Sequence, residues 1–283
     1  MTPSVPFAER RKISMIQLNE KKIEIGKFPD GTILMKEYVA KDFSGNQTAD
    51  ITWKFENNEE LVALIYLTRH LQSHGIENIH LYMPYIPNAR QDRVKSDEDV
   101  FTLKYFAEII NSLHFTSVRV LDPHSSVSEA LIDRIVIDSP KKNIVKVLEK
   151  IETKDRKLLM FYPDEGAMKR YSGMIDRPYT FGMKKRNWET GKIEGLEVCG
   201  MTELVDGSDI LIVDDISSRG GTFFFSAKAL KEIGAKDIYL YVSHCENTIL
   251  EGEVLSSGFV KKVFTTDSIY TGCNEKIEVI DYE

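Results

Sequence analysis

The sequence is poor in cysteine and has no long hydrophobic run. Its 283 residues include three cysteines, Cys199, Cys245 and Cys273, too few and too widely spaced for a zinc clamp or a disulfide framework. No apolar run approaches the roughly 20 residues that span a bilayer, and the opening segment lacks the continuous apolar stretch of a signal peptide. We therefore expect a cytoplasmic protein, in a reducing compartment, with no membrane partner.

An excess of positive charge is also absent. The chain carries 37 Lys and Arg against 44 Asp and Glu, a formal net charge of −7. This balance argues against nucleic acid as a partner, because phosphate backbones are bound through an excess of basic residues. With 42% hydrophobic and 29% charged residues, the composition is typical of a soluble globular protein, and the length suits two domains.

Local patterns predict how the chain begins to fold. The opening segment to about Asn19 has no period and is predicted to be a loose arm. Residues 21–38 alternate apolar and polar side chains around a Pro-Asp-Gly turn, which predicts a strand hairpin. Asn57 and Glu60 have the spacing of a capping box ahead of a helix that ends at Gly75.

Strands and helices are then predicted to alternate along the chain. The predicted strands are residues 79–83, 118–121, 134–137, 157–162, 179–183, 209–213 and 237–242, and the predicted helices are residues 99–113, 139–151, 165–174 and 222–233. Such alternation favours mainly parallel sheets flanked by helices. We predict an α/β protein of two tandem domains, residues 1–138 and residues 139–283, without a residue-level repeat between them.

The strongest chemical motif follows the predicted strand at residues 209–213. Two acidic residues end that strand, small residues come next, and a helix starts directly after them. This order places carboxylates and the N–H groups of a helix N-terminus at one edge of a sheet, an arrangement that suits a sugar phosphate. The carboxylates would bind ribose hydroxyls directly or through Mg²⁺, and the loop would hold the 5-phosphate. The plainer interpretation is an acidic turn that only caps the helix. The predicted ribose-phosphate-binding residues are Asp214, Asp215, Ser217, Ser218, Arg219, Gly220, Gly221 and Thr222.

Two segments of the first half carry groups suited to a nucleotide. Arg90 presents a forked, permanently charged guanidinium to triphosphate oxygens, and Gln91 offers both a donor and an acceptor. The plainer alternative is that Arg90 and Asp92 form a surface ion pair. His124 lies just beyond a predicted strand, two residues after Asp122, where a neutral imidazole can ligate a metal that bridges nucleotide phosphates.

Two segments of the second half add charged groups. Asp164 follows the predicted strand 157–162 and precedes a helix, so its carboxylate is a second candidate metal ligand beside an anion site. Residues 183–187 are basic and lead into a polar stretch, residues 188–195, that is predicted to be a hairpin. The plainer interpretation is a solvated basic turn, which charge runs usually form.

Five motifs together resemble those of phosphoribosylpyrophosphate (PRPP) synthetases. The acidic loop alone is also similar to that of type I phosphoribosyltransferases, but residues 84–93 and 121–125 resemble the ATP-binding and metal-histidine segments that only the synthetases have. Residues 27–31 are similar to the adenine-contacting turn of that family, and residues 162–170 to its diphosphate loop. The motifs occur in the family's order, and the resemblance spans about residues 23–266.

The resemblance implies a fold, a reaction and residue roles. The fold would be two tandem type I phosphoribosyltransferase-like domains, the first binding ATP and the second binding ribose 5-phosphate. The C1 hydroxyl of ribose 5-phosphate would attack the β-phosphorus of ATP and release AMP, with Mg²⁺ as cofactor. The implied ATP-binding residues are Phe28, Asp30, Arg90, Gln91, Asp92 and His124, the catalytic residues are Lys184, Arg186 and Arg90, and the metal ligands are His124 and Asp164. The turn with Phe28 would reach into a neighbouring copy, which implies at least a homodimer.

The sequence also departs from the family's pattern. It lacks a recognisable strand-and-helix unit before residues 27–31, and Ser218 and Arg219 stand where the family has an acid and a threonine. This exchange is expected to make the 5-phosphate pocket more positive, which would suit an acceptor such as ADP-ribose and a role in NAD biosynthesis. A phosphoribosyltransferase and a non-catalytic regulatory homologue are the remaining alternatives.

Overall fold

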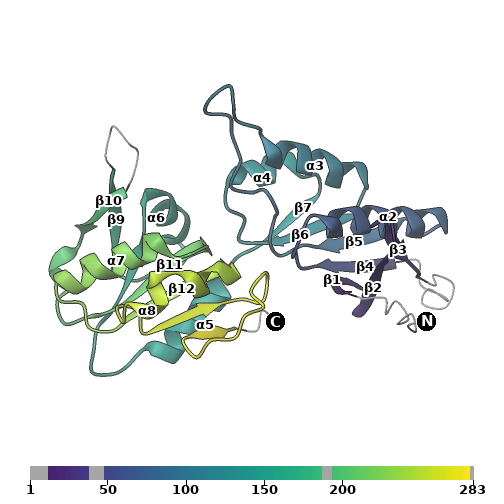
Figure 1. Ribbon diagram of the computed structural model, residues 1–283. Coiled ribbons are helices and arrows are strands. Elements are labelled where there is room, and N and C mark those ends of the chain that lie inside the picture. The colour runs from purple at the N-terminus through teal and green to yellow at the C-terminus, as the bar shows by residue number, and fades with distance from the viewer. Residues whose placement is uncertain (1–11, 38–47, 187–192, 281–283) are drawn as a thin grey trace, which may run out of the picture. The chain divides into compact units, whose positions relative to one another are not determined.

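The computed structural model describes residues 12–37, 48–186 and 193–280. The chain divides into two compact units, Met1–Asp138 and Ser139–Glu283, and each contains one seven-stranded sheet (Figure 1). In the described part of the chain, no helix combines the length and the apolar character needed to cross a membrane. The α/β class expected from the alternating pattern is confirmed, and both sheets are mixed.

The first unit is built on a mixed sheet of order β3-β2-β1-β4-β5-β6-β7. Strands β1 to β3 are antiparallel to their neighbours, and β4 to β7 run parallel to one another. The elements are β1 (Lys12–Leu18), β2 (Lys21–Lys27), β3 (Ile33–Met35), β4 (Thr48–Trp53), α2 (Glu59–Ser73), β5 (Asn78–Tyr82), α3 (Thr102–Ser112), β6 (Ser117–Leu121), α4 (Ser126–Leu131) and β7 (Ile135–Asp138).

The first sheet has one apolar face. In β4, Ala49, Ile51 and Trp53 are buried and Asp50 between them is exposed, as the two-residue period of a strand requires. The buried face packs against α2 and α3 in a single apolar core, and Figure 1 shows these helices on one side of the sheet. Polar pairs such as His80–Ser117, 2.7 Å apart, occupy the other face. The first unit is therefore a two-layer structure over its described residues, with its sheet flanked by helices as expected.

Two local predictions for this unit are wrong. The segment before Asn19 contains strand β1, which pairs with β2 and β4, so a strand does precede the turn at residues 27–31. Glu60 does not complete a capping box: it is buried, and its carboxylate accepts hydrogen bonds from the indole Nε1 of Trp53 at 3.1 Å and from the Met15 amide at 3.2 Å. A buried carboxylate needs such partners, and this tertiary demand overrides the local capping pattern.

The second unit has a mainly parallel sheet of order β10-β9-β8-β11-β12-β13-β14, in which β10 is antiparallel to β9. Its elements are α5 (Lys141–Ile151), β8 (Leu158–Tyr162), α6 (Glu165–Tyr171), β9 (Tyr179–Arg186), β10 (Ile193–Gly200), η1 (Thr202–Leu204), β11 (Asp209–Ser217), α7 (Gly221–Glu232), β12 (Ile238–Cys245), η2 (Asn247–Glu251), α8 (Glu253–Ser256), β13 (Lys262–Thr265) and β14 (Ile277–Val279). The antiparallel pair of β9 and β10 agrees with the predicted hairpin, whose tip lies outside the described residues.

The second sheet is buried on both faces. Ile210 and Ile212 of β11 point into a core with α7, whereas Leu211 and Val213 point into a second core with α5 and α6. A strand buried on both sides has a continuous apolar sequence, which explains the run of residues 210–213. This unit therefore has the three-layer arrangement expected from the sequence.

The strand order of the second unit creates a switch point. From β8 the chain passes through α6 to β9 on one side, and after the β9–β10 pair it returns to β11 on the other side of β8. The connections that leave β8 and β11 therefore diverge at their carboxyl ends. Ligands of open α/β sheets bind at such points.

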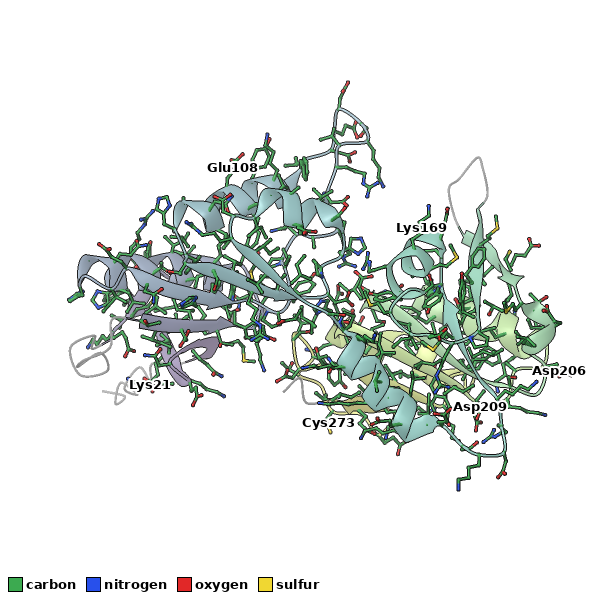
Figure 2. The ribbon with its side chains drawn as sticks, turned by 180° about the vertical axis from the view of Figure 1, so that it is seen from behind. Lys21, Glu108, Lys169, Asp206, Asp209 and Cys273 are labelled. Carbon is green, nitrogen blue, oxygen red and sulfur yellow. The ribbon has the colours of Figure 1, made fainter. Side chains whose placement is uncertain are left out.

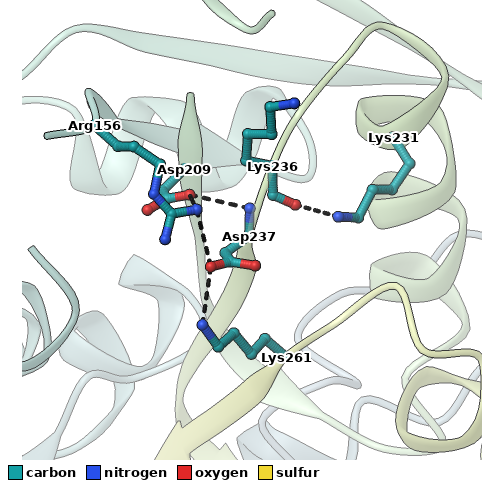
Figure 3. A network of polar contacts seen from close by, with 6 residues as sticks. All are labelled: Arg156, Asp209, Lys231, Lys236, Asp237 and Lys261. Carbon is teal, nitrogen blue, oxygen red and sulfur yellow. Dashed lines mark hydrogen bonds and ion pairs between the residues drawn. The ribbon is translucent and has the colours of Figure 1, made fainter. Parts of the chain in front are cut away.

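A network of charged residues ties the opposite, amino ends of these strands together (Figure 3). Nη1 of Arg156 lies 2.8 Å from Asp209 and 3.0 Å from Asp237, and Nζ of Lys261 lies 2.9 Å from the same Asp237 oxygen. The Asp237 amide also donates to Asp209 at 3.0 Å. Hydrogen bonds from Lys261 and Arg156 lower the pKa of Asp237, because they favour its charged form.

We expect Asp237→Asn to lower the free energy of unfolding by about 1 kcal/mol at pH 7. Because the folded-state pKa of Asp237 lies below the unfolded value near 3.9, this contribution is complete above about pH 5 and fades as the pH falls through the lowered pKa. Urea denaturation at pH 7 and pH 3 measures the difference, which should shrink at pH 3. Asp176→Asn, at an exposed carboxylate, is the matched control, and an equal loss in both variants would contradict the assignment.

Candidate functional site

Three carboxylates crowd the switch point of the second unit. Asp214 and Asp215 lie near the carboxyl end of β11, which extends to Ser217, four residues beyond its predicted end. Burial raises the pKa of Asp214 well above its ordinary value, and the negative charges of Asp215 and Asp164 raise it further. The structure therefore brings together three of the acidic residues singled out in the sequence. A cation, or hydrogen-bond donors such as sugar hydroxyls, would relieve this concentration of negative charge.

Asp164 has a structural contact of its own. It directly precedes α6, and its Oδ1 accepts a hydrogen bond from the Ala167 amide at 3.0 Å, which caps the helix. The cap uses one carboxylate oxygen and fixes the direction of the side chain at the carboxyl end of β8. A capping role and a role in ligand binding are compatible, because a carboxylate has two acceptor oxygens.

Arg170 balances part of this negative charge. Its Nη1 lies 3.4 Å from Oδ1 of Asp215, whose side chain is 5% exposed, and its guanidinium lies 5.5 Å from the centre of the Tyr171 ring. The ion pair connects the segment that resembles a diphosphate loop with the acidic end of β11. Sequence analysis did not select Arg170, although it lies within the motif of residues 162–170. Its contact with Asp215 is between distant parts of the chain and leaves no local pattern.

The site lies at the opposite end of the second unit from the charged network. Figure 2 shows Lys169, on α6, and Asp209, at the start of β11, at opposite ends of this unit. Parallel strands separate an amino edge from a carboxyl edge, and the two sets of charged residues occupy one edge each. The network at Asp209 therefore stabilises the amino edge of the sheet. The carboxyl edge is the one at which ligands of open α/β sheets bind.

Two glycines that lie very close to neighbouring atoms restrict the conformation of the loop after β11. Gly220 has a φ of 75°, in the left-handed region that favours glycine, and a Cβ there would lie 2.6 Å from Cγ1 of Val254. A Cβ at Gly252 would lie only 1.8 Å from the Arg219 carbonyl oxygen. Helix α7 starts at Gly221, and Gly220 has no side chain that could cap it. The N–H groups of the first helical turn therefore suit an anion.

The two residues that depart from the family's pattern are paired with carboxylates. Nη2 of Arg219 lies 3.0 Å from Oε2 of Glu251, and the hydroxyl of Ser218 donates to Oε2 of Glu246 at 2.6 Å. The positive charge of Arg219 is thus balanced by a carboxylate, and the expectation of a more positive pocket is not supported by this arrangement. Neither glutamate was singled out in the sequence, because each comes from the segment after β12.

In the first unit, the predicted ATP segment and the metal-histidine segment lie together. Asp92 is buried and accepts hydrogen bonds from Nε and Nη2 of Arg93 at 2.8 and 3.0 Å. The bonds from Arg93 lower the pKa of Asp92, and the neighbouring Ser125 and His124 lower it further. Asp92 therefore forms an ion pair with Arg93, a partner that the sequence did not indicate. The side chain of Arg90 is exposed.

Three other predicted ATP-binding residues have defined surroundings. Oε1 of Gln91 accepts a hydrogen bond from the Thr102 hydroxyl at 2.8 Å, which orients its amide. Asp30 accepts from the amide and the hydroxyl of Thr32 at 3.0 and 2.7 Å, and these bonds lower its pKa. Phe28, in the same turn, is an apolar ring with 49% of its surface exposed. An exposed aromatic ring beside an oriented carboxylate is suited to contact a nucleobase.

The donor set fits Mg²⁺ in part. Over the described residues, no group of three or more His, Cys, Asp or Glu side chains forms a ready-made metal site. Mg²⁺ does not require one, because it commonly binds one or two carboxylates and takes its other ligands from water and substrate phosphates. Asp164 provides such a carboxylate, whereas the imidazole of His124 is a donor that other metals prefer.

The predicted catalytic residues Lys184 and Arg186 belong to strand β9. In the ladder between β9 and β10, Lys184 is paired with Leu196.

Comparisons with known proteins identify the family. No protein-family model matches the chain. A ribose-phosphate pyrophosphokinase of Pyrococcus abyssi is 28% identical over 267 residues, covering 92% of this chain and 88% of that protein. One of Bradyrhizobium diazoefficiens is 30% identical over 226 residues, covering 76% and 68%. The fold matches a crystal structure of the phosphoribosylpyrophosphate synthetase of Mycobacterium smegmatis with a TM-score of 0.75 at 19% identity, over 92% of this chain and 85% of that one. This chain belongs to the ribose-phosphate pyrophosphokinase family.

Proposed function

We propose that this protein transfers the β,γ-diphosphate of ATP to the C1 hydroxyl of ribose 5-phosphate, forming PRPP and AMP. One observation carries the proposal. In this member of the family, an acidic strand end lies at the switch point, and the loop and helix N-terminus that follow it are suited to a phosphate. Asp214 and Asp215 would accept hydrogen bonds from ribose hydroxyls, and residues 218–222 would hold the 5-phosphate.

The proposed reaction is a single displacement at phosphorus. The C1 oxygen forms a bond to the β-phosphorus, the bond from that phosphorus to the oxygen bridging to the α-phosphate breaks, and the C1 hydroxyl loses its proton. AMP leaves with the bridging oxygen. Such transfers are accelerated mainly by alignment and by positive charge around the transferring group. In this proposal Lys184, Arg186 and Arg90 supply that charge, and closure over the site excludes water.

The first unit is proposed to bind ATP through Phe28, Asp30, Arg90 and Gln91. Asp92 would act mainly by orienting this segment, because Arg93 already occupies both of its oxygens. His124 of the first unit and Asp164 of the second are each proposed as a metal ligand, and Mg²⁺ would neutralise phosphate charge when bound. We further propose a cytoplasmic protein that forms at least a homodimer, with the turn at Phe28 contributing to the ATP site of a neighbouring copy.

An acceptor panel tests the proposed function. The protein is incubated with ATP, Mg²⁺ and either ribose 5-phosphate or ADP-ribose, and AMP and the product mass are measured. We expect AMP and PRPP with ribose 5-phosphate, at a rate at least about ten-fold above that with ADP-ribose, since a fitted site discriminates by differences in transition-state binding.

Each other outcome supports a different alternative. AMP with ADP-ribose alone would assign the acceptor to ADP-ribose, and the product would then serve NAD biosynthesis. Nucleotide formation from PRPP and a free base would support a phosphoribosyltransferase. No AMP with either acceptor would contradict the enzymatic proposal and favour a regulatory homologue.

Lys184→Ala tests the proposed catalytic charge. We expect kcat to fall by about 100-fold or more while the KM for ATP changes by less than about three-fold, because the charge on the transferring group develops in the transition state. Steady-state AMP release measures both constants. Lys185→Ala, at the residue between Lys184 and Arg186, is the matched control and should keep kcat. Equal losses of kcat and ATP affinity in Lys184→Ala would show that its role is ground-state binding.

A further inference from the structure

Glu246 lies directly after β12 and beside the loop that follows β11. We propose that Glu246 is a positioning residue for the acceptor phosphate: its carboxylate holds Ser218 and its amide holds Ser217, so that the loop presents its N–H groups to the phosphate. The inference rests on the proposed function, because it assigns the loop to an acceptor phosphate. Glu246 is not proposed to touch the reacting atoms.

The carboxylate and the amide of Glu246 form hydrogen bonds with the loop and with Thr248. The Ser218 hydroxyl donates to Oε2 at 2.6 Å, and the Thr248 hydroxyl donates to the same oxygen at 3.1 Å. The amide of Glu246 donates to the Ser217 carbonyl at 2.8 Å. Both the side chain and the backbone of Glu246 therefore hold consecutive residues of the loop. The bond from Ser218 is short because its acceptor is charged, and such bonds are the stronger ones.

The segment that carries Glu246 is itself fixed. Asn247 donates to the Thr271 hydroxyl at 2.8 Å and accepts from the Thr271 amide at 3.1 Å, which holds the start of η2 against a later part of the chain. At the other end, Gly252 packs so closely on the Arg219 carbonyl that a side chain would not fit. The loop is thus supported along residues 246–254 and has little room to move as a unit.

Electrostatics alone would make Glu246 unfavourable at this place. A carboxylate close to a phosphate site repels the phosphate, and the repulsion is strong where water is partly excluded. Removing the charge without any positioning effect would therefore strengthen phosphate binding. If the carboxylate instead fixes the loop, its removal weakens binding, because the freed loop must be ordered again when the phosphate arrives. The two explanations predict effects of opposite sign.

Glu246→Ala tests the inference, since it removes the carboxylate that accepts the Ser218 hydrogen bond. We expect the KM for ribose 5-phosphate to rise about ten-fold, with the KM for ATP and kcat within about two-fold of wild type. Titration calorimetry with ribose 5-phosphate should show the same ten-fold loss. Glu246→Gln removes the charge but keeps an amide oxygen that accepts the bond, so it should retain binding. Glu253→Ala makes the same truncation at an exposed position of α8 and should leave all three constants unchanged. Unchanged or tighter binding of ribose 5-phosphate by Glu246→Ala would overturn the inference.

A double-mutant cycle identifies the partner. Ser218→Ala removes the same hydrogen bond from the other side, so we expect it to weaken ribose 5-phosphate binding about as much as Glu246→Ala does, and the double variant to lose no more than either. Ser218→Thr keeps the hydroxyl and should retain binding. Additive losses would contradict the coupling. If Glu246→Ala does not fold, as judged by thermal unfolding, the comparison of Ser218→Ala with Ser218→Thr still decides whether the bond matters.

Failure of the inference and failure of the proposed function are distinguishable. If the wild type releases no AMP with ribose 5-phosphate, the proposed function is wrong, but titration with ribose 5-phosphate and with inorganic phosphate still measures the effect of Glu246 on the loop. If the wild type binds neither compound, the loop is not a phosphate site and the inference is overturned with it. If AMP is released and Glu246→Ala behaves as wild type, only the inference fails.

Discussion

The concentration of negative charge at the carboxyl ends of β8 and β11 is the constraint on which the rest of the site depends. Asp164, Asp214 and Asp215 lie at or just beyond the ends of two paired parallel strands with apolar interiors, so the fold places their negative charges near one another. Arg170 balances one of them. The remaining negative charge favours ligands that bring hydroxyl donors or a cation. The site is thus prepared for its ligand before binding.

The same logic extends to the loop that follows β11. Its cation and its hydroxyl, Arg219 and Ser218, are each matched by a carboxylate from the segment after β12. Both carboxylates come from the residues that directly follow β12, the strand next to β11 in the sheet. Two neighbouring strand connections therefore share their charges, which keeps the local charge of the loop close to neutral.

The sequence predicted those features whose residues follow one another along the chain. Residues 210–222 combine a strand, its acidic end and a helix start in one stretch, so the site's main motif could be recognised without a structure. Strand β1 was missed because its mixed polar sequence has no clear period, and it is formed by pairing with β2 and β4. The contacts of Arg170, Glu246 and Glu60 join residues from different elements. Only the fold brings such partners together, so no local spacing could have revealed them.

Over the described residues, the two units differ in the number of apolar cores that pack against their sheets. The first has one apolar core on one side of its sheet, whereas β11 in the second separates two cores. Local resistance to unfolding follows the number of buried contacts around a backbone hydrogen bond. Amide protons of the first sheet should therefore exchange with solvent sooner than those of the second. The half that we assign to the nucleotide would then be the more adaptable one, and the half that we assign to the sugar would serve as its rigid counterpart.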